Sequence, residues 1–136
     1  MPRKISISGL QEKLEHLQRD ILIPLRGGKC ELCGSTRNLV ADHCFKRTIR
    51  QLFFERANLT ILCNDQCHFK KSKRIGAVDL AVYQWVRMRE GDKKFDSMQR
   101  IAERHEPFPS WSKRWWLENK QDELEKELLC AKKQGY

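Results

Sequence analysis

Two pairs of cysteines limit what this chain can fold into more than any other feature of its sequence. Cys30 and Cys33 are separated by two residues, and Cys63 and Cys67 follow farther along the chain with three residues between them. Four sulfur ligands at this kind of spacing are typical of a tetrahedral zinc site. Gly34, directly after the first pair, suits a backbone turn that brings both thiolates to one ion. We therefore expect a structural zinc knuckle to organise the fold.

Two alternatives to a four-cysteine zinc site are open at this point. The gap in the second pair is one residue longer than usual, so His68 or Cys44 could replace one sulfur as a ligand. The cysteines could also pair as disulfides, as they do in small secreted domains. A lysine-rich, highly charged sequence without a secretory signal argues against disulfides, and we expect a reducing, cytoplasmic compartment.

A second group of polar residues lies between and beside the cysteine pairs. Asp42 and His43 end a short apolar run, residues 38–43, that predicts a strand, and His68 begins a predicted helix. An acid and a histidine brought together across these elements suit Mg²⁺ or another divalent ion such as Mn²⁺. The alternatives are that both histidines are zinc ligands, that His43 is a surface residue, and that Asn58 only forms a turn.

The order of these residues resembles a known family. Cys-x2-Cys, Asp-His, Asn and Cys-xn-Cys-His, spread over residues 28–74, resemble the HNH endonuclease family. The resemblance implies a ββα-metal core, in which two strands and a helix surround one divalent ion. It implies that His43 is the general base, that Asp42 and His68 hold the catalytic ion, and that Asn58 ties the loop between the strands. The four cysteines correspond to the structural zinc set that many members contain.

The chemistry of phosphodiester hydrolysis agrees with this set of residues. Imidazole, with an ordinary pKa of about 6.5, can deprotonate water near neutral pH, and a divalent ion neutralises the charge that builds on the phosphate. Residues 52–58 also resemble HNH proteins of phage recombination modules, which implies a phage or bacterial origin. The alternative function is a non-catalytic zinc-binding module for nucleic acid or protein. It leaves unexplained why the stretch supplies more ligands than the four that one zinc needs.

Length and net charge limit the number of domains and the class of binding partner. The chain has 136 residues, of which 40% are hydrophobic, which favours a single domain over residues 1–136. Its 27 basic and 18 acidic residues give a net charge of +9, which favours a polyanionic partner such as DNA. The sequence has no long apolar span, so we expect no membrane association.

Basic residues gather on both sides of the predicted site. One group lies in the connection after His43, and a denser group directly follows His68. On a helix beside the site, such residues bind the nucleic-acid backbone and contribute affinity more than sequence preference. The predicted nucleic-acid-binding residues are Lys46, Arg47, Arg50, Lys70, Lys71, Lys73 and Arg74.

The remaining segments predict helices around an α+β core. An apolar stripe with Ser8 as N-cap predicts a helix over residues 8–24, which packs on the core or forms a dimer seam. Residues 77–105 predict a helical region whose first helix is apolar on more than one face and therefore largely buried or shared with another segment. Residues 110–134 predict a C-terminal helix whose tryptophans anchor it on the core or stack on bases. Its acidic second half favours contact with a second copy or another protein.

Overall fold

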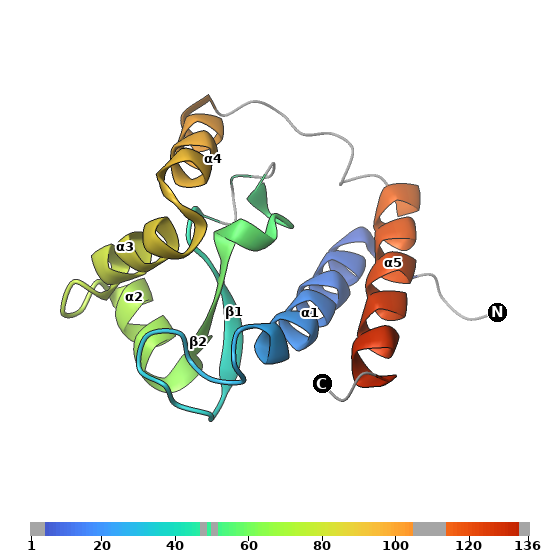
Figure 1. Ribbon diagram of the computed structural model, residues 1–136. Helices are drawn as coiled ribbons and strands as arrows, with labels where there is room; N and C mark the ends of the chain where they lie inside the picture. The colour runs from blue at the N-terminus through green and yellow to red at the C-terminus, as the bar shows by residue number, and fades with distance from the viewer. Residues whose placement is uncertain (1–4, 47–48, 50–51, 105–113, 134–136) are drawn as a thin grey trace.

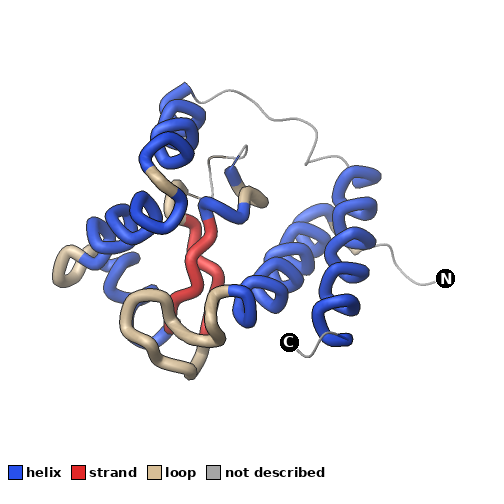
Figure 2. The backbone as a smooth tube through the Cα atoms, in the orientation of Figure 1, coloured by secondary structure: helices blue, strands red, loops and turns tan. Residues whose placement is uncertain are grey.

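Helices surround one small sheet in the computed structural model, which describes residues 5–46, 49, 52–104 and 114–133 (Figures 1 and 2). This confirms the predicted α+β class. The elements in chain order are α1 (Ile7–Leu25), β1 (Leu39–His43), a 3-10 helix (Arg56–Asn58), β2 (Leu59–Cys63), one turn of π-helix (Asn64–His68), α2 (Phe69–Lys73), α3 (Val78–Glu90), α4 (Asp92–Arg104) and α5 (Arg114–Lys133).

The sheet consists of β1 and β2, which run antiparallel. Leu39 lies opposite Cys63, and His43 lies opposite Leu59. All five residues of β2 are buried, whereas β1 is buried only at its end, at Asp42 and His43. The π-helical turn joins the C-terminal end of β2 directly to α2, so α2 lies beside the sheet (Figure 1).

Helix α1 begins one residue before and ends one residue after the predicted range of residues 8–24. The side chain of Ser6, not Ser8, caps it by accepting a hydrogen bond of 3.1 Å from the backbone N–H of Gly9. Pro24 lies in the last turn without ending the helix there. The apolar stripe of α1 packs against α5, which lies beside it in Figure 1. The buried residues of this contact are Leu10, Leu14, Ile21, Leu117 and Leu124.

Helices α3 and α4 cover the other side of the sheet and the knuckle. Their buried residues, Val82, Val86, Phe95 and Met98, share one core with three of the knuckle cysteines. The first helix of this region is shared with its neighbours and not largely buried, because Val82 and Val86 are buried whereas Met88 is 70% exposed and Leu80 59% exposed. Only one face of α3 meets other elements, so the remaining apolar residues face solvent.

The helix predicted at His68 corresponds to α2, which ends at Lys73 because Arg74 adopts a left-handed conformation with φ of 56°. In α5, Trp116 packs against Phe54 with ring centroids 5.8 Å apart, whereas Trp115 is 61% exposed. Trp111 lies outside the described residues. Each described helix is too short or too polar to cross a lipid bilayer.

Candidate functional site

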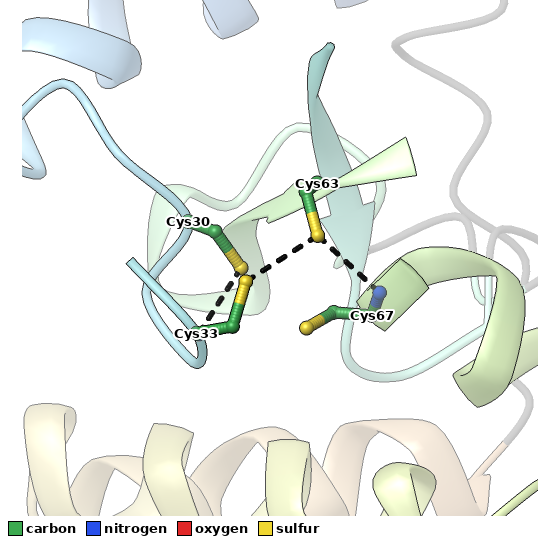
Figure 3. Close-up of side chains that lie close together, drawn as sticks. All are labelled: Cys30, Cys33, Cys63 and Cys67. Atoms are coloured by element: carbon green, nitrogen blue, oxygen red, sulfur yellow. Dashed lines mark hydrogen bonds between the residues drawn. The ribbon is translucent and has the colours of Figure 1, made fainter. Parts of the chain in front are cut away.

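Four cysteine sulfurs converge at one end of the sheet (Figure 3). The Sγ atoms of Cys30, Cys33, Cys63 and Cys67 all lie within 4.8 Å of one another. A tetrahedral ion with Zn–S distances of about 2.3 Å holds its sulfurs about 3.8 Å apart, so the cluster suits zinc. The cysteines are free thiols, and the 3.5 Å between Cys33 Sγ and Cys63 Sγ is too long for a disulfide. The predicted four-cysteine group therefore comes together.

The backbone presents both cysteine pairs in the same way. The backbone N–H of Cys33 points at Cys30 Sγ at 3.5 Å, and that of Cys67 points at Cys63 Sγ at 3.4 Å. The extra residue in the second pair is accommodated by the π-helical turn, which is wider than an α-helical turn. Neither His68 nor Cys44 belongs to the cluster, so both alternatives for the fourth ligand are ruled out within the described residues.

Two thiols of the cluster, Cys30 and Cys67, have pKa values shifted in opposite directions. Burial opposes ionisation of Cys30, but backbone N–H groups near its sulfur outweigh burial and lower its pKa to about 7. Burial and the neighbouring sulfurs instead raise the pKa of Cys67. Cys30 therefore ionises more readily than Cys67, and the charge of a bound cation favours the thiolate form of the full set.

A second site lies at the C-terminal end of β1, where the side chains of His68 and Lys71 approach Asp42. Asp42 Oδ1 lies 3.5 Å from His68 Nε2, and Asp42 Oδ2 accepts a 2.7 Å hydrogen bond from Lys71 Nζ. The other ring nitrogen of His68, Nδ1, is 3.2 Å from the side-chain oxygen of Asn64, which turns Nε2 toward the carboxylate. Burial raises the pKa of Asp42, and the nearby Lys71 ammonium opposes that effect. The predicted pair of oxygen and nitrogen ligands is therefore adjacent in space.

His43 directly follows Asp42 in the chain. Its ring is buried and is held by contacts with Phe53. Its Nε2 lies 2.9 Å from the backbone carbonyl oxygen of Phe53, and its ring packs on the Phe53 ring at 4.9 Å between centroids. A carbonyl only accepts hydrogen bonds, so Nε2 carries the proton in the neutral ring. The basic nitrogen of the neutral ring is therefore Nδ1.

Asn58 is fully buried and ties the connection between the strands to the start of β2. Its Oδ1 accepts a 2.6 Å hydrogen bond from the backbone N–H of Phe45, and its Nδ2 donates to the carbonyls of Phe45 at 3.1 Å and Leu52 at 3.0 Å. Phe45 and Leu52, which both belong to the connection after His43, are thereby fixed to one side chain. This contact holds in place the segment that also supplies the Phe53 carbonyl.

Asp42, His43 and His68 line one open cavity of about 500 Å³. Its basic lining residues include Lys46, Lys71 and Arg74. Glu15 of α1 also lines it, and nothing in the spacing of α1 distinguishes this residue from the other polar residues of that helix. The cavity is wide enough to admit a phosphate group together with water.

The predicted nucleic-acid-binding residues fall into three groups. Lys46, Lys70, Lys73 and Arg74 are exposed around the cavity or on α2. Arg47 and Arg50 lie outside the described residues. Lys71 differs from both groups, because its side chain is turned inward onto Asp42 and the backbone carbonyl of His43.

No protein-family model, curated protein or solved structure matches the chain. What the two sites can do therefore follows from their own geometry.

The sequence reading missed a buried carboxylate inside the first cysteine pair. Glu31 lies between Cys30 and Cys33 and its side chain is only 4% exposed. It accepts hydrogen bonds from Arg26 at 3.1 Å and Arg89 at 2.8 Å. It also accepts hydrogen bonds from the indole of Trp85 and the backbone N–H of Ile61. Glu31 therefore joins the knuckle to α1, β2 and α3, and its position between two cysteines was the only available signal.

Replacing Glu31 by Gln is expected to lower the free energy of unfolding by about 3–5 kcal/mol, because the largely buried Arg26 then loses its ion-pair partner and Arg89 keeps Glu90 but loses Glu31. Urea denaturation of the zinc-loaded protein measures this loss. The matched control is Glu123→Gln on α5, where the carboxylate is 70% exposed and pairs with Lys120 at 3.4 Å. We expect this control to change stability by less than about 0.5 kcal/mol. Equal stability of the two variants would contradict the role given to Glu31.

Proposed function

We propose that the chain is a metal-dependent endonuclease of the HNH type that hydrolyses DNA phosphodiester bonds. The observation that carries the proposal is the approach of Asp42 Oδ1 and His68 Nε2 to 3.5 Å in a cavity that His43 also lines. Two ligands at about 2.1 Å from one ion lie roughly 3–4 Å apart, so this pair fits Mg²⁺ or Mn²⁺. Such an ion, when bound, neutralises charge on the scissile phosphate.

His43 is the proposed general base. The hydrogen bond that Nε2 donates to the Phe53 carbonyl places the proton of the neutral ring on Nε2, so Nδ1 is the basic nitrogen, and the same carbonyl stabilises the imidazolium that forms when Nδ1 takes a proton from water. Asn58 supports this arrangement because its hydrogen bonds hold the connection that supplies the carbonyl. The role of Asn58 is therefore to position the base, without contact to the substrate.

The four-cysteine cluster is the proposed structural zinc site. It is separate from the Asp42 and His68 pair in its ligands, and closed structural sites with four thiolates are the usual form for zinc. Zinc there would hold the loop before β1 to the end of β2. The strands and the helix that carry the catalytic side chains would thereby keep their relative positions.

Charge supports DNA as the substrate. The net charge is +9, and exposed basic residues flank the cavity on α2 and after β1. Such residues bind phosphates and provide affinity that falls steeply with salt. Lys46, Lys70, Lys73 and Arg74 are the described residues that we assign to this contact.

A non-catalytic zinc-binding module for nucleic acid or protein is the second candidate. One observation favours it: Lys71 already pairs with the Asp42 carboxylate at 2.7 Å, so this group is satisfied without an ion. In that case the cysteine cluster and the basic surface would carry the function. The two candidates differ in whether DNA is cut.

Cleavage of supercoiled plasmid distinguishes the candidates. We expect the zinc-loaded protein to nick or cut the plasmid with Mg²⁺ or Mn²⁺ and to lose this activity in EDTA applied too briefly to remove zinc. Asp42→Asn is expected to reduce cleavage about 100-fold or more, because metal-ligand removal affects the charged transition state directly. Asp122→Asn, on the exposed face of α5, is the matched control. Binding of plasmid without cleavage at any ion concentration would overturn the nuclease proposal and favour the binding module.

A further inference from the structure

Lys71 lies where the proposed divalent ion would meet Asp42. It follows His68 by three residues, so α2 presents both side chains toward the end of β1. Its Nζ donates hydrogen bonds of 2.7 Å to Asp42 Oδ2 and 2.7 Å to the backbone carbonyl of His43. The lysine side chain is 15% exposed, and the Asp42 side chain 7%. This is a well-formed, largely buried ion pair inside the proposed site.

The two oxygens of Asp42 face different groups. Oδ1 faces His68 Nε2, whereas Oδ2 faces the Lys71 ammonium. An ion held by Oδ1 and His68 would therefore meet the lysine charge across the same carboxylate. Like charges at such separations repel strongly in a partly buried site, where solvent screening is weak.

We propose that Lys71 is the resident counter-ion of Asp42, and that a divalent ion competes with its ammonium for this carboxylate. The proposal rests on the proposed nuclease function, because it concerns the ion site of that activity. The carboxylate and the ammonium together carry no net charge, and a neutral His68 adds none. The positive charge of Lys71 thus offsets the attraction of the Asp42 carboxylate for a dication. This holds both if the ammonium stays at Oδ2 and if it leaves when the ion binds.

This assignment differs from the sequence prediction that Lys71 binds DNA. A lysine that contacts phosphate extends into solvent, as its exposed neighbours Lys70 and Lys73 do. Lys71 instead makes two hydrogen bonds to its own chain. Its removal should therefore act first on ion binding and only secondarily on DNA binding.

Binding of Mn²⁺ without DNA tests the proposal. The zinc-loaded protein is titrated with Mn²⁺, and free Mn²⁺ is measured by its electron paramagnetic resonance signal. We expect Lys71→Met to lower the Kd for Mn²⁺ about tenfold or more relative to wild type. Lys93→Met removes the same charge from an exposed position of α4, a helix that carries no residue of the proposed site, and we expect its Kd to stay within about twofold of wild type.

Two further variants keep the proposal testable if Lys71→Met does not fold. Lys71→Gln can still donate a hydrogen bond to the His43 carbonyl but carries no charge, so it should also bind Mn²⁺ more tightly. Lys71→Arg keeps the charge and should bind as weakly as wild type. Circular dichroism and zinc content verify that each variant is folded.

The outcomes separate this inference from the nuclease proposal. If the folded Lys71 variants bind Mn²⁺ no more tightly than wild type, while Asp42→Asn abolishes binding, the ion site stands and the competition by Lys71 is wrong. If Asp42→Asn changes Mn²⁺ binding in neither the wild-type nor the Lys71→Met background, the ion site itself is absent. That result would overturn both proposals.

Discussion

Replacing His43 by alanine is expected to lower the rate of DNA cleavage about 10²- to 10⁴-fold, the range typical for loss of a general base. The variant removes the nitrogen that accepts the proton from water but leaves the proposed ligands Asp42 and His68 in place. DNA affinity and zinc content should be unchanged. Single-turnover cleavage of a plasmid at saturating Mn²⁺ measures the chemical step without contributions from product release.

His16→Ala is the matched control for this substitution. His16 is an exposed histidine of α1 that we assign no role, so its loss should leave the cleavage rate within about twofold of wild type. An unchanged rate for a folded His43→Ala variant would rule out His43 as the base. The buried ring also packs on Phe53, so thermal denaturation must show that the variant is folded before its rate is interpreted.

Loss of zinc is expected to have the largest effect on stability. Zinc contributes about 10–16 kcal/mol to the folding of small zinc-binding peptides, and here three of the four cysteines belong to the core that contains Val82 and Phe95. We expect Cys67→Ser to lose the metal and to abolish the cooperative thermal transition of this core. Circular dichroism with metal analysis measures both properties in one sample.

Cys130→Ser provides the matched control for the cysteine cluster. Cys130 is an exposed, free cysteine on α5, outside the cluster, so its replacement should leave both the zinc content and the melting temperature unchanged. A Cys67→Ser variant that melts like wild type would show that the fold does not depend on the metal. Prolonged dialysis of wild type against a strong chelator should reproduce the effect of the substitution.

The candidate sites were predictable from sequence to the extent that their residues are close together in the chain or share a strong spacing signal. Cysteine pairs with short gaps form a ligand set in few other ways, and the structure confirms that the four thiols lie close enough together to hold one metal ion. The proximity of Asp42 to His68 was expected from the order of motifs, and the structure has them 3.5 Å apart. Their catalytic roles and the assignment to the HNH family stay predictions.

Contacts of lysine and arginine side chains were much harder to predict. Lys71 belongs to a run of basic residues that look alike in sequence, yet it alone of the described members of that run turns inward onto Asp42. The choice depends on which position of a short helix faces the end of β1. Glu31 likewise has partners up to 58 residues away in the chain, so no local pattern reveals that it is buried.

The sequence by itself determined the cysteine cluster, the α+β class and the existence of the main helices, because ligand spacing and apolar periodicity are local properties of the chain. The tertiary structure alone decided which helix faces are covered, since α3 has partners on one side only and leaves Met88 exposed. It also decided how the buried charges pair. Long-range packing selects one partner for Lys71 and for Glu31 from many chemically equivalent ones, and that selection has no signature in local sequence.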